Sequence, residues 1–315
     1  MKVATSLADA NVSRPSVVSI GNFDGLHLGH REILKTVLQQ SRELGVQSVA
    51  MTFSPHPIQF LAPDRAPRLI STAEQKIEMM KGTGIDLLFI AQFDHAFSRM
   101  SPEHFVRQYL IEGLQARAVC IGGNFNFGYR QRGTIQTLRE FQTDFDVIEV
   151  PPVRVRGTIV SSSRIRELVA VGEVSGACRL LGRWIQLEGA IVSGAGRGRT
   201  MRVPTLNLET QNELIPRVGV YVTQMSLDGG PFMNAVTNVG YRPTFNETSL
   251  TIETFVLDES VPEDATKARL EFVYHLRDER KFDSPDALRA QITVDVARAK
   301  KFFRQLRHGH ERQRG

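Results

Sequence analysis

The order of apolar and helical segments constrains this chain more than any other feature. Short apolar runs alternate with stretches of helical periodicity in the first part of the chain, a pattern that predicts a parallel sheet joined by helices. The expected strands cover residues 16–20, 46–53, 86–92 and 117–121, and the expected helices cover 28–44, 72–82 and 101–113. Ligands of such sheets bind beyond the carboxyl ends of the strands. The segments that follow each apolar run are therefore the first candidates for a site.

The pattern changes after two helical stretches, 165–171 and 174–181, that end at Gly182. Short alternating strands separated by Gly, Pro and Asn then predict a β-barrel or sandwich. These strands cover 185–192, 218–225, 234–239, 251–257 and 268–276. A closing helix begins with Ser284 as N-cap and Pro285 at its first position. Its apolar stripe is expected to pack on the barrel and consists of Leu288, Ile292, Val296, Ala299 and Phe303.

Length and composition agree with two domains, because 315 residues with 41% hydrophobic content can bury two independent cores. The expected domains are 1–182 and 183–308, followed by a basic tail, 309–315, that is expected to be disordered. Cys120 and Cys178 lie far apart outside any Cys/His cluster, which argues against a disulfide framework or structural zinc. The chain shows neither an export signal nor an apolar run long enough to cross a membrane, so we expect a cytoplasmic protein.

The charge distribution matters more than the net charge of +5. Residues 298–315 hold seven basic residues and one acid, which gives +6 there and −1 for the rest of the chain. A basic end on an otherwise balanced body is typical of a solvated terminal helix. We therefore expect no nucleic-acid partner and no membrane partner, with RNA binding by this tail as the alternative.

The loop Gly21–His30 is the strongest candidate for chemistry, because it lies where a strand leads into a helix that begins near His27. Its glycines permit a sharp turn and close approach to a ligand, and a helix N-terminus favours phosphate. Asp24, His27 and His30 add titratable groups within seven positions. The alternative is an ordinary strand–turn–helix corner with exposed histidines.

The pattern G-x-F-D-G-x-H-x-G-H resembles the nucleotidylyltransferase superfamily, and specifically the N-terminal half of the bacterial bifunctional riboflavin kinase/FAD synthetase family. The resemblance continues at Thr52–Pro57, at Gly122–Gly128 with Arg130 and Gly133, and at Ser161–Arg166. It implies a Rossmann-like nucleotidylyltransferase domain followed by a riboflavin kinase barrel with a terminal helix. It also implies phosphorylation of riboflavin to FMN in the barrel and adenylylation of FMN to FAD, with release of pyrophosphate, in the first domain.

Within the first domain, the resemblance implies that His27 and His30 donate hydrogen bonds to phosphate oxygens as charge builds in the transition state. The implied ATP and phosphate contacts are Gly21, Phe23, Asp24, Gly25, Gly29, Ser162, Arg164 and Arg166. The implied flavin or nucleotide contacts are Pro55, His56, Asn124 and Phe125. A place in the hydrophobic core is the alternative for the phenylalanines.

The resemblance extends to the second domain, where a basic glycine loop precedes Pro204-Thr205-Leu206-Asn207. This tetrapeptide is similar to the P-T-x-N motif of riboflavin kinases, whose Thr and Asn oxygens bind Mg–ATP. The implied ATP contacts are Gly194, Gly196, Arg199, Thr205 and Asn207, with Thr205 and Asn207 toward Mg²⁺. The similarity continues over 238–245, 252–258 and 276–282, and it makes Glu253 the candidate catalytic base. The alternative is that Glu253 simply faces solvent, as most strand glutamates do.

Two departures from the family pattern affect the kinase motif. Met201-Arg202-Val203 replaces a Leu-Gly-aromatic tripeptide, and Leu206 replaces the usual Ala, so its larger side chain either crowds the nucleotide or turns into the core. The implied cofactor is Mg²⁺ with ATP, and flavins are substrate and product. The oligomeric state is left open. Two alternatives remain: a flavin- or nucleotide-binding regulator with one or both sites inactive, and a nucleotidylyltransferase for another phosphate substrate.

Overall fold

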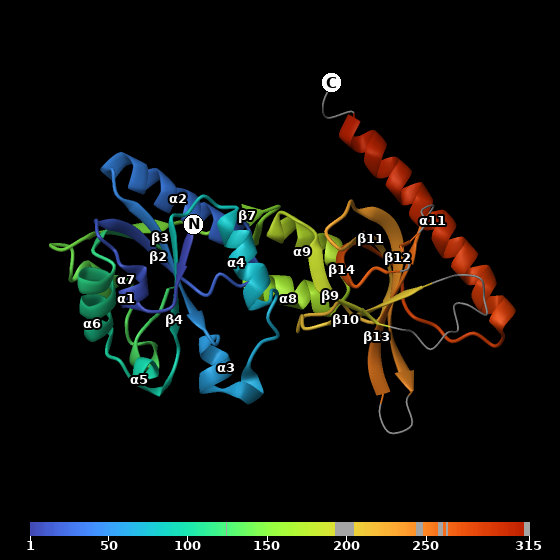
Figure 1. Cartoon of the computed structure of the whole chain (residues 1–315), viewed down its shortest axis with the longest axis horizontal. Helices are drawn as coiled ribbons and strands as arrows, with labels where there is room; N and C mark the ends of the chain where they lie inside the picture. Colours follow the sequence, from blue (N-terminus) through green and yellow to red (C-terminus); the bar gives the residue numbers. More distant parts are fainter. Residues whose placement is uncertain (124, 193–204, 244–247, 258–260, 263, 312–315) are drawn as a thin grey trace. The chain divides into compact units, whose positions relative to one another are not determined.

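The computed structural model describes residues 1–123, 125–192, 205–243, 248–257, 261–262 and 264–311. The chain divides into two compact units, Met1–Ser162 and Ser163–Gly315 (Figure 1). Each unit has its own buried apolar clusters.

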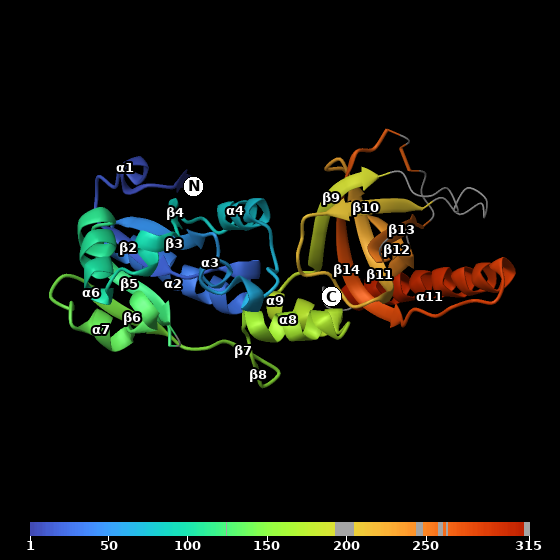
Figure 2. The same ribbon diagram turned by 90° about the horizontal axis from the view of Figure 1, so that it is seen from below.

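The first unit is built on a six-stranded parallel sheet with the strand order β1-β4-β3-β2-β5-β6 (Figure 2). Val17 and Val18 of β2 belong to different buried apolar clusters, so they pack on opposite faces of the sheet. Both faces are therefore buried, as in other parallel sheets. The strands are β1 (Lys2–Ala4), β2 (Ser16–Ile20), β3 (Gln47–Ser54), β4 (Leu87–Gln92), β5 (Ala116–Gly122) and β6 (Asp146–Val150).

Helices cover both faces of this sheet. Leu34 and Val37 of α2 pack with Met80 of α4 on one face, whereas Phe105 and Leu110 pack on the other. The α-helices are α1 (Leu7–Ala10), α2 (Leu28–Leu44), α3 (Pro57–Leu61), α4 (Ala73–Lys81), α5 (His95–Ser98), α6 (Pro102–Phe105) and α7 (Ile135–Arg139). Short elements complete the unit: the 3₁₀ helices η1 (Asp24–Leu26), η2 (Pro63–Arg65) and η4 (Tyr129–Gln131), the π-helical η3 (Val106–Gly113), and the hairpin β7 (Arg154–Val155) and β8 (Thr158–Ile159).

The second unit contains a closed six-stranded antiparallel barrel with the strand order β10-β13-β12-β11-β14-β9. The expected barrel is confirmed, and the alternative of a sandwich is wrong. The strands are β9 (Ile185–Val192), β10 (Leu206–Thr210), β11 (Gly219–Leu227), β12 (Met233–Pro243), β13 (Thr248–Val256) and β14 (Lys267–Arg277). Strand β10 begins within the motif 204–207, which was not expected to form a strand, and continues to Thr210.

Helix α11 (Pro285–Glu311) packs along the barrel wall (Figure 1). Ala299 and Phe303 are buried there, with Val296 beside them, against a cluster that includes Val220 and Val222 of β11. Ser284 accepts a hydrogen bond from the Ala287 N–H at 3.2 Å, as an N-cap does. The helix continues through residues 309–311, which were expected to begin a disordered tail, and residues 312–315 lie outside the described part.

The compact units divide earlier than the domain boundary expected after residue 182. Helices α8 (Ser162–Ala170) and α9 (Val174–Leu181) lie almost entirely in the second unit. On α9, the Ser175 hydroxyl donates to the Val273 carbonyl of β14 at 3.1 Å, and the buried Cys178 thiol lies 3.5 Å from the Phe272 carbonyl. Helix α9 therefore packs on β14 and β9 of the barrel, a tertiary contact that the change of pattern at Trp184 does not reveal.

Candidate active sites

The predicted site segments of the first unit follow the carboxyl ends of neighbouring strands. Gly21 directly follows β2, Pro55 directly follows β3, and Phe125 lies three residues beyond β5. Since β2 pairs with both β3 and β5 in parallel, these segments share one edge of the sheet. Asn124, an expected flavin contact, lies outside the described residues.

The loop after β2 turns through three residues with positive φ, which are Phe23, Gly25 and Leu26. Phe23 has φ 48° and is buried, and its ring lies 3.4 Å from where a Cβ on Gly21 would be. Gly25 has φ 75°, and a Cβ there would lie 2.7 Å from Cγ2 of Ile70. Both the backbone conformation and the available space therefore require glycine at position 25.

Asp24 anchors this loop to the segment before α4. Its carboxylate is buried and accepts the backbone N–H groups of Ile70 at 3.0 Å and of Ser71 at 3.2 Å. The Asp24 carbonyl accepts the Ser162 hydroxyl at 3.1 Å. Asp24 thus holds the loop in shape, so its expected contribution to phosphate binding is to position the loop rather than to contact an anion.

His27 caps helix α2, and its ring stacks on His30. The Nδ1 atom of His27 accepts the His30 backbone N–H at 3.2 Å. A neutral His27 therefore carries its proton on Nε2, which is then a hydrogen-bond donor. The two rings lie 3.5 Å apart between centroids with 14° between their planes. A side chain on Gly29 would meet the His27 ring at 3.2 Å, so the glycine preserves this arrangement.

Lys76 on α4 is a neighbour of this loop that the sequence analysis missed. Its ammonium group donates to Thr52 Oγ1 at 3.5 Å, and Thr52 Oγ1 in turn donates to the Asn22 carbonyl at 3.2 Å. Burial lowers the pKa of Lys76, and the negative charge of Asp24 opposes this effect. No sequence signal marks Lys76, because it lies in a helix with several other charged residues.

The other residues expected at the first site differ in their burial and in their contacts. His56 is buried and caps α3, accepting the Ile58 N–H at 3.3 Å, while Pro55 is exposed. Phe125 is partly buried against the core and stacks on Phe127, with centroids 5.4 Å apart. This packing favours the alternative reading of these phenylalanines as core residues.

The serine–arginine segment spans the division between the units. Ser162 contacts the Asp24 carbonyl as described, whereas Arg164 and Arg166 belong to the second unit. Arg164 forms an ion pair with Glu167 at 2.9 Å on the exposed surface of α8. The assignment of both arginines to the phosphate site stays a prediction.

In the second unit, the register of three strands brings Asn207, Glu253 and Asn238 side by side. Glu253 of β13 is the direct partner of Asn207 on β10 and of Asn238 on β12. Side chains of directly paired residues lie on the same face of a sheet. Because Ile252 and Thr254 are buried on the interior face, Glu253 and its two neighbours lie on the outer face. A carboxylate between two amides is therefore the centre of the candidate kinase site.

The interior face carries a chain of buried hydroxyls instead. Thr223 and Thr237 lie 2.8 Å apart between their Oγ1 atoms, and Thr237 and Thr254 lie 2.9 Å apart. Leu206 pairs with Thr254 and so lies on this interior side. The Leu206 side chain, which replaces the Ala usual in the family, therefore lies toward the barrel interior, away from Asn207 and Glu253.

The rest of the expected kinase loop cannot be placed in the same way. Gly194, Gly196 and Arg199 lie outside the described residues, as does the departure Met201–Val203. Thr205 is described and directly precedes β10. It stands two residues before Asn207. Along an extended segment, side chains two residues apart lie on the same side, so Thr205 leads into the site on the side of Asn207.

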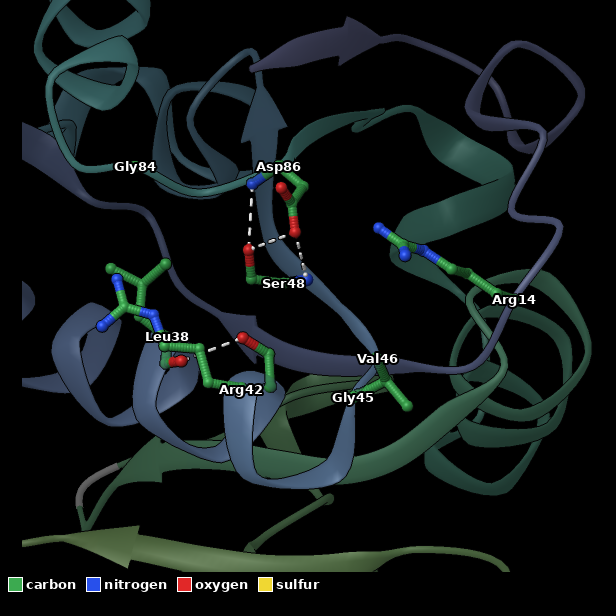
Figure 3. Close-up of a pocket in the computed structure, with 9 residues that line it drawn as sticks. Arg14, Leu38, Arg42, Gly45, Val46, Ser48, Gly84 and Asp86 are labelled. Carbon is green, nitrogen blue, oxygen red and sulfur yellow. Dashed lines mark hydrogen bonds between the residues drawn. The ribbon is translucent and has the colours of Figure 1, made fainter.

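A cavity of about 350 Å³ lies at the opposite, amino-terminal ends of the parallel strands (Figure 3). Asp86, just before β4, accepts the Ser48 N–H at 2.9 Å and the Ser48 hydroxyl at 2.8 Å. The cavity is lined by Arg14, Leu38, Ser41, Arg42, Gly45, Val46, Ser48, Gly84 and Asp86. None of these belongs to the predicted site, so the cavity and the histidine loop are separate features of this unit.

The described ranges contain neither a membrane-spanning helix nor a cluster of metal-binding side chains. Among the helices described there, none is both long and apolar enough to span a membrane. No group of three or more His, Cys, Asp or Glu side chains in that part of the chain is arranged to hold a metal ion.

A doubly wound α/β unit with a histidine-capped helix at its strand ends, followed by a barrel with a carboxylate between amides, defines a two-domain class of phosphate-transferring enzyme. Comparison of this chain with known protein families supports that class. A family model described as FAD synthetase matches residues 9–164, and one described as riboflavin kinase matches residues 181–303.

Relatives and a solved structure cover nearly the whole chain. A bifunctional riboflavin kinase/FMN adenylyltransferase of Bacillus subtilis is 34% identical over 93% of this chain and 94% of its own length. One from Haemophilus influenzae is 31% identical over 96% and 99%. A crystal structure described as a macrolide-efflux protein from Streptococcus pneumoniae has a TM-score of 0.85 at 28% identity and covers 95% of this chain and 98% of its own. The chain belongs to the bifunctional riboflavin kinase/FMN adenylyltransferase family.

Proposed function

We propose that the chain makes FAD in two ATP-dependent steps, with riboflavin phosphorylated on the barrel and FMN adenylylated at the histidine loop of the α/β unit. The family matches support the two reactions. The assignment of each step to particular residues rests on the geometry described above. We further propose that the enzyme acts in the cytoplasm.

In the kinase site, Glu253 accepts the proton of the flavin's primary hydroxyl as that oxygen attacks the γ-phosphate of ATP. The observation that carries this assignment is the register that places Glu253 directly between Asn207 and Asn238. A positioned carboxylate is the usual proton acceptor in phosphoryl transfer to an alcohol. Mg²⁺ enters as part of the Mg–ATP substrate, and the oxygens of Thr205 and Asn207 are of the hard type that Mg²⁺ prefers.

In the adenylyltransferase site, the FMN phosphate attacks the α-phosphate of a second ATP, and pyrophosphate leaves. His27 donates from Nε2, because its Nδ1 is already an acceptor for the His30 N–H. Positioned donors of this kind stabilise the charge that develops on the phosphate oxygens in the transition state. Lys76 supplies a positive charge near the same loop.

The experiment is chromatography of flavins after incubation of the full chain with riboflavin, Mg²⁺ and ATP. Wild type should yield FMN and then FAD, Glu253→Ala should leave riboflavin unconverted, and His27→Ala/His30→Ala should stop at FMN. A regulator with inactive sites would instead bind flavin without any turnover. Conversion of supplied FMN but not of riboflavin would limit the activity to the first unit.

A further inference from the structure

A second carboxylate reaches the outer face of the barrel beside Glu253. A Cβ placed on Gly240 of β12 would lie 2.4 Å from Oε1 of Glu279 and 3.1 Å from Nδ2 of Asn238. The carboxylate of Glu279 therefore occupies the space that the missing side chain of Gly240 leaves open. Glu279 itself is exposed and lies two residues beyond the end of β14.

This position belongs to the same face as the candidate kinase site. Asn238, which lies next to the Glu279 carboxylate, is the direct strand partner of Glu253. Gly240 is two residues further along β12 and so projects from the same side of the sheet. Helix α11 covers this face further along, where Phe255 of β13 packs against its cluster.

An ion pair holds the segment that carries Glu279. Asp295 of α11 is buried and accepts Arg277 Nε at 2.9 Å and Arg277 Nη2 at 2.8 Å. The same guanidinium donates from Nη1 to the Asp278 carbonyl at 2.9 Å. Gln291 donates to Asp295 at 2.7 Å and accepts from Arg280. Side chains on both sides of Glu279, those of Arg277 and Arg280, are thus tied to α11.

We propose that Glu279 binds hydroxyl groups of the flavin's polyol side chain in the kinase site, and that the Arg277–Asp295 ion pair positions it there. The proposal rests on the proposed kinase function. An ionised carboxylate only accepts hydrogen bonds, so its ligand must offer donors. The phosphates of ATP offer acceptors and negative charge, whereas the ribityl chain of riboflavin offers several O–H groups.

The first test compares wild type with Glu279→Gln in the full-length protein. We expect the KM for riboflavin to rise about 10-fold to 100-fold, the effect of losing a hydrogen bond to a charged group, while the KM for ATP changes little. Lumiflavin, which has the ring system without the polyol chain, should inhibit both forms equally. Conversion of FMN to FAD serves as the control in the same chain and should not change.

Gly240→Ala tests the same contact without altering a polar group. Its backbone is outside the left-handed region, and the nearest atom to the new methyl is the end of the Glu279 side chain. The substitution should therefore displace Glu279 and raise the KM for riboflavin as Glu279→Ala does. The double variant Gly240→Ala/Glu279→Ala should be no worse than Glu279→Ala alone, because both changes remove one contact.

Asp295→Asn tests the positioning role. It should raise the KM for riboflavin in wild type and have no further effect in a Glu279→Gln background. A rise in the KM for ATP alone, a fall in kcat with unchanged KM, or weaker inhibition by lumiflavin would each overturn the proposal. If the chain never phosphorylates riboflavin, the proposed kinase function fails, and equilibrium binding of riboflavin to wild type and Glu279→Gln still decides whether the contact exists.

Discussion

His27 and His30 stack face to face, with 3.5 Å between ring centroids, while the Nδ1 atom of His27 caps the helix that carries His30. The cap fixes the orientation of the first ring, and the stack fixes that of the second. The two rings of the proposed adenylyltransferase site are thereby held in place before any substrate binds. Such preorganisation is what a site needs in order to stabilise charge that appears only in the transition state.

Replacement of His27 separates the cap from the chemistry. His27→Asn keeps an N-cap acceptor and should preserve the stability of α2, whereas His27→Ala should cost about 1 kcal/mol in the free energy of unfolding. Both variants should reduce adenylyl transfer by about 100-fold to 1,000-fold, the effect of losing one such donor. Steady-state assays and urea denaturation measure the two effects, and phosphorylation of riboflavin is the control. Full activity of His27→Asn would show that the ring acts only as a cap.

Gly25→Ala and Gly45→Ala form a matched pair. Both residues have positive φ, 75° and 66°, but a Cβ on Gly25 would lie 2.7 Å from Ile70 whereas nothing lies within 4 Å of one on Gly45. Gly45→Ala should therefore cost about 1 kcal/mol from backbone strain alone. Gly25→Ala should add an overpacking cost of about 1–3 kcal/mol and reduce FAD formation, because the loop before His27 must shift. Equal destabilisation in urea titrations would show that Ile70 yields freely.

Lys76→Met should stabilise the folded state and weaken adenylyl transfer. Burial lowers the pKa of Lys76 below its ordinary value of 10.5, so the folded state disfavours the charged form. The charge therefore costs stability below the lowered pKa, and stability recovers as the pH rises from there toward 10.5. The methionine variant should have a higher Tm at pH 7, lack this alkaline gain, and show weaker adenylyl transfer. A lower Tm with normal activity would contradict both expectations.

The two cysteines should be unreactive in the folded protein. Burial raises the pKa of Cys120 to about 12 and that of Cys178 to about 11. At pH 8 the thiolate fractions are on the order of 0.01% and 0.1%, so a thiol reagent should label neither residue until denaturant exposes both. Because the folded state retains these protons, the contribution of the two thiols to stability should be constant well below about pH 8.5 and should fall as the pH rises from there toward those values. Rapid labelling of native protein at pH 8 would show that the surrounding core opens readily.

The sequence predicted most of the secondary structure because each element had a local signal. A short apolar run marked β2, alternating apolar residues marked β9, and Ser284 with Pro285 marked the start of α11. Strand β10 was missed because its first two residues, Leu206 and Asn207, end a motif that was interpreted only as a ligand loop. β1 and β6 were missed because each is short and has few buried residues.

The candidate sites depend on relations that no local pattern encodes. The position of Glu253 between two amides comes from the pairing of β13 both with the preceding strand β12 and with β10, which β11 and β12 separate from it in sequence. The anchoring of Asp24 to residues 70–71, and the approach of Lys76 to the same loop, likewise arise from packing of α4 against the sheet. Glu279 lies in the segment 276–282, to which the sequence analysis assigned no role. The space that Gly240 leaves open showed where the Glu279 carboxylate lies.

Gly189 shows how a substitution outside both candidate sites can affect the kinase reaction. A Cβ there would lie 1.8 Å from the carbonyl oxygen of Glu209 on the neighbouring strand, so β9 and β10 meet at a seam with no room for any side chain. β10 carries Asn207 into register with Glu253, and the same strand pairs with β9 along this seam. A single methyl group at position 189 is therefore expected to displace β10 and to weaken riboflavin phosphorylation while every residue of the reaction centre remains unchanged, a loss of function that inspection of the centre alone would not explain.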